Sequence, residues 1–504
     1  MRILAVDLGT THVKAGCLDP EGRLRRRSVR ALPLLRDETG RAEHDPEALW
    51  DAFVAAAREA LGEEAPAVRG LILSAYQLGL LPVDAQGRPL MGLMTLLDTR
   101  PRETFPGLLA RIDGAILYAR TGCPPLFHYP LAKLEWLRAR RPEIFRAARW
   151  FLGAKEYLLL RLLGEPFTEP SLATATQLMD LRTLRWDPEL LAAVELSADR
   201  LPEVVAPEAR LGPLRPEAAA ALGLPPEVEV IAGVYDGGAM GLGLGALAPG
   251  VGVMNLGTTA MIRMIAAQPV LDHSPRMRLQ TYALLPGRWF PGGALNNAGI
   301  VRQWLQEAVL RVVDAEAETL AEATAGPTGI LFFPFLTGER EPGIGPMASG
   351  VIFGLRVHHG RGHLIRAAME GVAFALRRLL EALWENGLRP NRLRAGGGGT
   401  RSPLWMRILA SVLATPIEVP EIPEPGLLGS AMLAWKALGV LPDLPGHPPE
   451  TPVAVYPPVE EWVPAYAEQF ARFQAVLADL EAAFQHGGSS EAHHLTMGGA
   501  HEPL

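Results

Sequence analysis

The chain of 504 residues has 48% hydrophobic residues, so it can bury more than one core, and its length predicts two to four domains. Its net charge of −7 comes from 48 basic and 55 acidic residues that are mixed along the chain, which excludes a basic stripe for a nucleic-acid partner. The two cysteines, Cys17 and Cys123, exclude a disulfide framework and a Cys-rich zinc site. Without a signal-peptide pattern or a long apolar run, the sequence predicts a cytoplasmic protein with no membrane partner.

The first predicted unit is a hairpin. Residues 3–8 have the pattern of a buried strand, a Gly-Thr-Thr turn follows, and residues 12–18 continue as a second strand. Backbone N–H groups in such a turn can face phosphate oxygens, although an ordinary hairpin turn is the alternative. Lys14 would point back toward the turn, and Asp7 offers a charged oxygen ligand suited to Mg²⁺.

A helix at 45–61, opened by an Asp-Pro pair, and a buried strand at 68–74 come next. In open α/β sheets, ligands lie beyond the carboxyl ends of the strands. The polar residues that follow strands are therefore candidate ligand contacts: Tyr76, Gln77, Asp98 and Arg100. His128 lies further along, in a loop that precedes a predicted helix.

Asp236 stands at the start of a glycine-rich segment, directly after a strand at 228–232. An N-cap is the commonest reason for an Asp in that place. The following helix is rich in glycine, however, and each glycine costs on the order of 1 kcal/mol of helix stability unless a close approach requires it. A helix N-terminus would also keep the carboxylate ionised, which is the state that a general base for an acceptor hydroxyl needs.

The hairpin has a second copy. Residues 251–259 (VGVMNLGTT) repeat residues 3–11 (ILAVDLGTT), and Asn255 replaces the charge of Asp7 with a neutral side chain of similar shape. An internal copy at this spacing predicts two similar domains that face each other, with a boundary near residues 240–250.

The second half continues with a strand at 259–265 and with four predicted helices, at 296–310, 361–385, 402–414 and 427–438. Between a strand and a helix, the run Gly396–Gly399 indicates a backbone surface for a flat or phosphorylated ligand, and a flexible loop is the alternative. The Glu339-Arg340-Glu341 stretch is interpreted as a structural corner with internal ion pairs. The polar tail after Gln485 is predicted to be disordered.

Many motifs occur together in a familiar order, among them DLGTTHVKAG, YDGGAMGLG, NLGTTA, FLTGEREP, GGGTRSPLW and LLGSAMLA. Over about residues 1–440 the chain resembles the FGGY carbohydrate kinases, and it is most similar to gluconate kinases, with xylulose kinases next. The resemblance implies an α/β fold of two actin-like ATPase (ribonuclease H-like) domains that face a central cleft. It divides the chain into a mainly sugar-binding domain at 1–245, a mainly nucleotide-binding domain at 246–485 and a tail at 486–504.

The resemblance also implies an ATP-dependent kinase acting on a terminal hydroxyl of a small sugar, polyol or sugar acid, with gluconate the leading acceptor. A xylulose or other pentulose kinase, a non-catalytic nucleotide-dependent switch and a homodimer are left open. Asp236 would be the base, and Asp7 would hold Mg²⁺ near the phosphates. The other phosphate- or nucleotide-binding residues would be Gly9, Thr10, Thr11, Lys14, Gly257, Thr258, Thr259, Gly397, Gly398 and Arg401. Acceptor contacts would come from Gln77, Asp98, Arg100 and His128.

Three leucines depart from the family pattern on the acceptor side. Leu78, Leu96 and Leu126 stand where related kinases commonly place His, Trp and His. An apolar wall discriminates between substrates by only about 1–3 kcal/mol per missing contact, so we expect a comparatively permissive kinase. If the acceptor carries a carboxylate, Arg100 is the expected partner.

Overall fold

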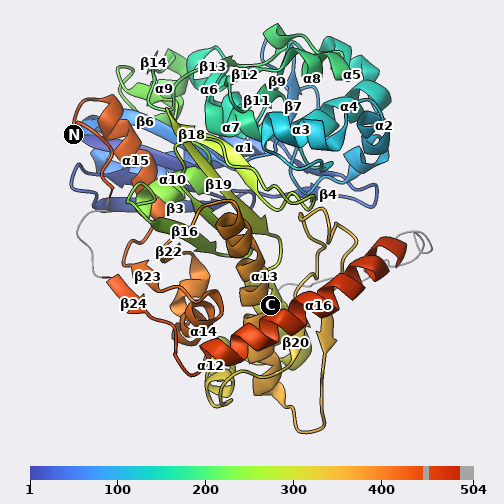
Figure 1. The fold of residues 1–504 in the computed structure, drawn as a ribbon. Helices are drawn as coiled ribbons and strands as arrows, with labels where there is room; N and C mark the ends of the chain where they lie inside the picture. The colour runs from blue at the N-terminus through green and yellow to red at the C-terminus, as the bar shows by residue number, and fades with distance from the viewer. Residues whose placement is uncertain (447–452, 488–504) are drawn as a thin grey trace.

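Two mixed β-sheets organise the chain (Figure 1). The computed structural model describes residues 1–446 and 453–487, the side chains of the last three excepted. One sheet, with the helices around it, forms the upper lobe of Figure 1, here called the N-terminal lobe. The other sheet forms the lower, C-terminal lobe.

The N-terminal sheet has six strands, and β1 lies at its centre. β1 pairs antiparallel with β2 and parallel with β6. In sheet order the strands are β14 (Arg210–Pro213), β15 (Glu229–Ile231), β6 (Val68–Ala75), β1 (Arg2–Leu8), β2 (His12–Leu18) and β3 (Leu24–Ala31).

The C-terminal sheet has seven strands, and β16 takes the central place. β16 pairs antiparallel with β17 and parallel with β22. In sheet order the strands are β18 (Gln280–Leu285), β19 (Arg288–Leu295), β17 (Ala260–Met264), β16 (Val251–Leu256), β22 (Arg392–Gly396), β23 (Ile417–Pro420) and β24 (Val453–Tyr456).

The two sheets share one topology. From β3 to β14 the pairings are antiparallel, antiparallel, parallel, parallel and antiparallel, and from β19 to β24 the same series occurs. β18 is the additional strand of the second sheet. This correspondence confirms that the chain contains two similar α/β units, as the repeated hairpin predicts.

Alternation along the central strands explains how each sheet is buried on both faces. Ile3 and Ala5 of β1 contribute to a different core from Leu4, Val6 and Leu8. β16 repeats this division between its odd and even positions. On the outer face of the N-terminal sheet packs α1 (Pro46–Leu61), whose N-terminus is capped by Asp45. On the outer face of the C-terminal sheet packs α13 (Arg361–Glu385).

The remaining elements extend the two lobes. Those of the N-terminal lobe are β4 (Leu35–Arg36), β5 (Ala42–His44), β7 (Leu81–Val83), β8 (Leu93–Met94), α2 (Phe105–Leu109), α3 (Gly114–Thr121), α4 (Pro130–Arg140), α5 (Pro142–Ala147), β9 (Trp150–Leu152), α6 (Ala154–Leu163), β10 (Phe167–Thr168), α7 (Pro170–Ala173), β11 (Met179–Asp180), β12 (Arg185–Trp186), α8 (Pro188–Ala193), β13 (Glu203–Val204) and α9 (Pro216–Leu222). Those of the C-terminal lobe are α11 (Gly299–Trp304), α12 (Asp314–Glu322), β20 (Leu331–Phe333), β21 (Val351–Phe353), α14 (Pro403–Leu413) and α16 (Val463–Gly487).

Two predicted elements differ from the structure. The helix expected at 296–310 begins at Gly299 and continues after Trp304 as a π-helical turn to Leu310. α16 runs two residues into the predicted tail, and residues 488–504 of that tail lie outside the described part of the chain.

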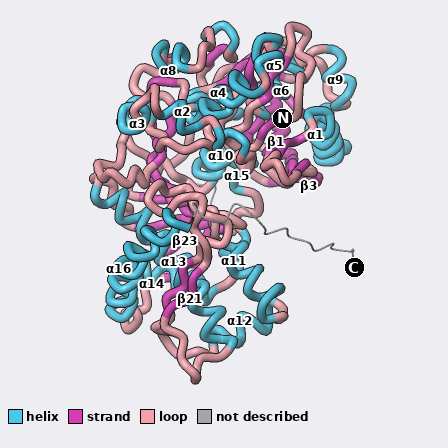
Figure 2. Tube along the Cα trace, turned by 90° about the vertical axis from the view of Figure 1, so that its right-hand side faces the viewer, coloured by secondary structure: helices cyan, strands magenta, loops and turns pink. Residues whose placement is uncertain are grey.

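Helices α10 (Asp236–Gly243) and α15 (Pro425–Ala437) join the lobes (Figure 2). α15 follows β23 in sequence but packs against β1 and β6, so the chain returns to the N-terminal lobe. A division of the chain at residue 245 therefore stays a prediction. The helices touch through glycines, because a Cβ at Gly243 would lie 1.9 Å from the Pro425 carbonyl oxygen, and one at Gly429 would lie 1.9 Å from that of Ala239.

This contact generates a prediction. Gly429→Ala forces α10 away from α15, because backbone atoms cannot yield as a flexible side chain can. We expect a loss of about 1–3 kcal/mol of stability, seen as a lower midpoint of thermal unfolding. Gly107→Ala in α2 is the control, since a Cβ there meets nothing within 4 Å. Equal midpoints for the two variants would show that the helices can separate without cost.

Candidate active site

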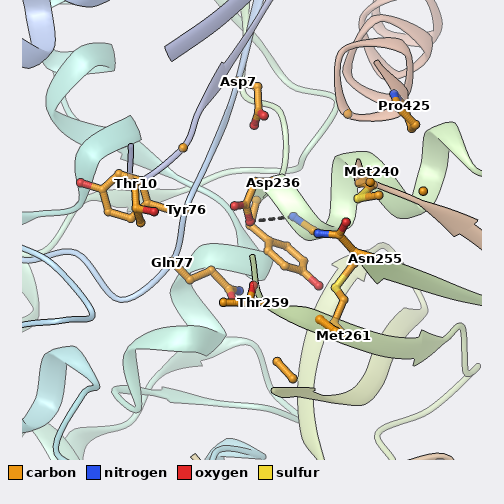
Figure 3. A pocket seen from close by; sticks show the side chains of 18 of the residues that line it. Asp7, Thr10, Tyr76, Gln77, Asp236, Met240, Asn255, Thr259, Met261 and Pro425 are labelled. Carbon is orange, nitrogen blue, oxygen red and sulfur yellow. Dashed lines mark hydrogen bonds between the residues drawn. The ribbon is translucent and has the colours of Figure 1, made fainter. Parts of the chain in front are cut away.

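A cavity of about 780 Å³ lies between the lobes and collects most of the predicted site residues (Figure 3). The predicted residues that line it are Asp7, Gly9, Thr10, Thr11, Lys14, Gln77, His128, Asp236, Thr259, Gly397, Gly398 and Arg401. The predicted residues that do not line it are Asp98, Arg100, Gly257 and Thr258.

The two repeated turns reach the cavity from opposite lobes. In the first, the Gly9 N–H donates to the His12 carbonyl over 2.9 Å, and in the second the Gly257 N–H donates to that of Thr259 over 2.9 Å. His44 supports the first turn, since its ring nitrogens lie 2.8 Å from the Tyr76 hydroxyl and 3.0 Å from the Thr10 carbonyl oxygen. The hairpins thus present corresponding backbone segments to one space.

Asp7 and Asp236 place two carboxylates in this space (Figure 3). Asp7 accepts a hydrogen bond from the Ser74 hydroxyl over 2.8 Å, and Asp236 accepts one from the Gly237 N–H over 2.6 Å. Burial, with the charge of Asp7, raises the pKa of Asp236 to about 7. Burial also raises the pKa of Asp7, against the effect of Ser74.

The expectation that the helix N-terminus keeps Asp236 ionised is therefore wrong as stated. Loss of water and repulsion by Asp7 outweigh the favourable N–H contact. A carboxylate with a pKa near neutrality remains suited to general-base work, because the proton affinity then matches the operating pH.

The donor set fits a magnesium ion that binds together with phosphates. Two half-buried carboxylates with raised pKa values would both be stabilised by a cation. Residues 1–446 and 453–487 contain no group of three or more His, Cys, Asp and Glu ligands, so a cage made of protein ligands alone is absent there. Mg²⁺ commonly takes one or two carboxylates and completes its shell with water and substrate phosphates.

Glycines line the end of the cavity beside the second repeated turn. Gly397 has φ 96°, and a Cβ there would lie 2.5 Å from the Asn255 side-chain oxygen, so only glycine allows this approach to the second turn. Gly398 begins a short 3₁₀ turn that ends at Arg401. Facing residues come from the segment 419–426 that leads into α15. Lys14 reaches this segment through an ion pair of 3.2 Å with Glu424.

The acceptor end, as we call the part of the cavity around His128 and Gln77, is lined by Tyr76, Gln77, Leu78, Leu96, Leu126, His128, Tyr129, Tyr235, Arg263, Gln280, Tyr282 and Arg340. All three departing leucines belong to this wall. The Gln77 amide donates to the Ser171 carbonyl over 3.0 Å. Burial lowers the pKa of His128 to about 3, so the ring is neutral.

Asp98 and Arg100 lie behind this wall. Asp98 is fully buried, and it accepts hydrogen bonds from the Arg100 Nε over 2.9 Å and from the Ala42 N–H over 3.2 Å. Arg100 also pairs with Glu43 and lies 4.6 Å from the Trp136 ring centroid. Their contacts hold the loop after β8 against β5, and the structure does not bring them to the cavity.

The corner around Arg340 needs a correction. Glu339 and Glu341 fit the predicted structural role, since Glu339 accepts from the Asn296 N–H over 3.0 Å and Glu341 pairs with Arg378. Arg340 instead lines the acceptor end. Because Arg340 stands between Glu339 and Glu341, the sequence suggested ion pairs within this stretch. The two glutamates instead bind residues from distant elements, which a local sequence pattern cannot predict.

Lys133, which the sequence did not single out, fixes the wall from behind. Its fully buried ammonium group donates to the carbonyl oxygens of Leu78 and, over 2.7 Å, Thr95. Leu78 has φ 68°, a conformation that needs such support. The available sequence signal was a lysine between apolar residues, Ala132 and Leu134, near the start of α4.

Burial lowers the pKa of Lys133 to about 7, below its ordinary value near 10 in an unfolded chain. Between these values the unfolded chain binds the extra proton, so this group makes stability rise with pH. We expect the unfolding midpoint of the wild type, minus that of Lys133→Met, to increase from pH 6 to pH 9.5. A pH-independent difference would mean that Lys133 stays charged in the folded protein.

Comparison with known proteins places these features in a family. The N-terminal domain of the FGGY family of carbohydrate kinases matches residues 2–243, and its C-terminal domain matches residues 252–438. A gluconokinase of Bacillus licheniformis is 31% identical over 87% of this chain and 88% of that protein. Among the helices of residues 1–446 and 453–487, none is long and apolar enough to span a membrane.

Two solved structures resemble the chain closely. The ligand-bound xylulose kinase of Lactobacillus acidophilus has a TM-score of 0.92 at 26% identity, covering 96% of this chain and 99% of that one. The gluconate kinase of the same organism has a TM-score of 0.91 at 27% identity, with the same coverage. With the matching domains, sheet topology and cavity, these similarities show that the chain belongs to the FGGY family of carbohydrate kinases and is a phosphotransferase enzyme.

Proposed function

We propose that this kinase transfers the γ-phosphoryl group of ATP to a terminal hydroxyl of a small sugar, polyol or sugar acid, with gluconate as the leading acceptor. The observation that carries the proposal is the position of Asp236, whose carboxylate shares one cavity with two phosphate-type turns and a polar acceptor end. The similar gluconokinase supports gluconate. Because a xylulose kinase is as similar in structure, a pentulose is the second candidate.

In the proposed reaction, Asp236 takes the proton of the acceptor hydroxyl as its oxygen forms a bond to the γ-phosphorus. The bond from that phosphorus to the bridging oxygen breaks, and ADP leaves with the electron pair. Backbone N–H groups of Thr10 and Thr259, together with Lys14, would stabilise the developing negative charge, whereas the Gly9 N–H is bonded within the first turn. Mg²⁺, held by Asp7, supplies further neutralisation of the phosphate oxygens when it is bound.

The nucleotide would bind where both lobes contribute backbone. Gly397, Gly398 and Arg401 line the end of the cavity beside the second turn, and they would contact the nucleoside or its α-phosphate. Gly257 and Thr258 would act through the conformation of that turn, since they lie outside the lining. Closure of the lobes would exclude water, which protects ATP from hydrolysis.

An assay that couples ADP release to a spectroscopic signal tests the proposal against aldonic acids, pentuloses, hexoses and polyols. Asp236→Asn should keep the fold and bind ATP but lower kcat by about 10²–10⁴-fold, the usual contribution of a general base. Near wild-type kcat in the folded variant would remove Asp236 from the mechanism. ADP release that no acceptor stimulates would favour a nucleotide-dependent switch without transferase chemistry.

The repeated turns allow a matched exchange. Asp7→Asn should lower turnover and raise the free Mg²⁺ concentration required for half-maximal rate, because a charged oxygen ligand is lost. Asn255→Asp should have a much smaller effect, since its added carboxylate only repels the phosphates. Steady-state rates against free Mg²⁺ decide between them. Equal effects would show that the two turns do not divide the metal and nucleotide roles as proposed.

A further inference from the structure

The acceptor end of the cavity carries polar atoms that the described part of the chain leaves without partners. His128 Nδ1, Tyr235 Oη, Arg263 Nε and Arg340 Nε are buried and lack a hydrogen-bond partner there. All four residues line the cavity. A buried polar atom without a partner costs about 1–3 kcal/mol, so their concentration at one end indicates that a polar ligand completes them.

The charges at this end favour an anion. Two guanidinium groups, those of Arg263 and Arg340, line it, whereas the carboxylates that line the cavity are those of Asp7, Asp236 and Glu424, at or toward the phosphate turns. The positive charge of Arg340 lowers the pKa of both Asp236 and His128, so Arg340 lies near the proposed base and near the acceptor wall. The charges of Asp236 and Glu339 act on Arg340, but among the described residues no carboxylate forms an ion pair with it, and an anionic acceptor would supply that direct partner.

Arg263 and Arg340 differ in the hydrogen bonds that their guanidinium groups make within the protein. Arg263 donates to the carbonyl oxygens of Gln280 and Phe290 over 2.8 Å each, and it lies 4.6 Å from the Tyr282 ring centroid. In the described part of the chain Arg340 has no side-chain hydrogen bond and no ion pair. Arg263 is therefore held in the sheet, and Arg340 is the guanidinium that remains for a ligand.

Building on the proposed function, we infer that Arg340 binds the carboxylate of a sugar-acid acceptor and thereby sets the preference for acids over neutral sugars. A guanidinium fork matches a carboxylate through two parallel hydrogen bonds. His128, neutral and with a free ring nitrogen, bonds a hydroxyl of the same acceptor. Arg340 takes the role that the sequence suggested for Arg100, whose guanidinium is occupied by Asp98 and Glu43.

In this arrangement the recognised end of the acceptor differs from its reacting end. The carboxylate lies at Arg340, and the terminal hydroxyl at the other end of the chain lies at Asp236. An interaction remote from the reacting atoms, equally strong in the ground and transition states, changes KM and leaves kcat nearly unchanged. Loss of the Arg340 side chain should therefore raise KM for the acid and leave kcat nearly unchanged.

The test compares gluconate with sorbitol, in which a CH₂OH group replaces the carboxylate of the same carbon chain, and with xylulose. Arg340→Met should lower kcat/KM for gluconate by about 10- to 100-fold through KM, as the loss of a charge-assisted hydrogen bond predicts. At pH 9, where Asp236 is ionised with or without the charge of Arg340, the values for the neutral acceptors should change by less than about threefold, because they lack the charged group. Arg340→Lys should restore part of the gluconate activity, since it keeps the charge without the fork.

Arg356→Met is the matched control, because Arg356 is exposed and lies outside the cavity. It should leave every acceptor unchanged. If Arg340→Met affects gluconate and sorbitol equally, or affects neither, the inference is overturned while gluconate kinase activity stands.

A separate measurement covers the case in which the wild type phosphorylates only neutral sugars. The proposed acceptor is then wrong, and calorimetric titration of gluconate into the wild type and Arg340→Met decides the inference alone. Binding that depends on Arg340 supports an acid-binding site. No binding to the wild type overturns it.

Discussion

The contact between α10 and α15 is the constraint on which the rest of the site depends. Gly243 and Gly429 let two helix backbones touch, and this contact joins the sheet of one lobe to the sheet of the other. α10 begins with Asp236, and α15 packs on β1, the strand whose next-to-last residue is Asp7. The spacing of these two carboxylates is therefore set by backbone packing. Loops would position the two carboxylates less accurately than packed helices and strands do, because loops move more easily.

The electrostatics of the cavity follow from that placement. Burial raises the pKa of both Asp7 and Asp236, and repulsion by Asp7 raises that of Asp236 further. Among the residues that the structure describes, buried polar atoms without a hydrogen-bond partner gather at the acceptor end. A fold retains such unfavourable features where a ligand compensates for them, and a metal–nucleotide complex and a polar acceptor carry the required charges.

Sequence reasoning was most accurate where the information is local. The strand–turn–strand copies, the glycine-rich start of α10 and the alternation of β1 and β16 are all encoded within about ten residues, because sheet and helix periodicities are short. The two copies predicted two similar domains, and the structure adds that their sheets share one topology. The site residues on or beside these elements, such as Thr10, Asp236 and Gly397, line the cavity as a consequence.

Contacts between side chains far apart in the sequence could not be predicted. Asp98 and Arg100 follow a strand, as ligand-binding residues do, yet Glu43, from β5, turns Arg100 into part of a buried ion-pair network. For Arg340 the prediction failed in the other direction. Glu339 accepts a hydrogen bond from the Asn296 N–H and Glu341 pairs with Arg378, so Arg340 lines the cavity and is not part of a local ion pair. Lys133 supports the acceptor wall through two carbonyl oxygens, and no pattern identifies a carbonyl as a partner in advance.

The lining residues also indicate that acceptor binding is shared between the two lobes, whereas the sequence suggested that it belongs mainly to the first. The acceptor end combines Gln77 and His128 of the N-terminal lobe with Arg263, Tyr282 and Arg340 of the C-terminal lobe. An acceptor that contacts His128 and Arg340 together must bridge the lobes, so its binding free energy favours whichever arrangement brings them to contact distance. On the proposed function, acceptor recognition and exclusion of water from the phosphates would then depend on the same approach of the two lobes. A kinase arranged in this way would protect ATP from hydrolysis by coupling lobe closure to the presence of the acceptor.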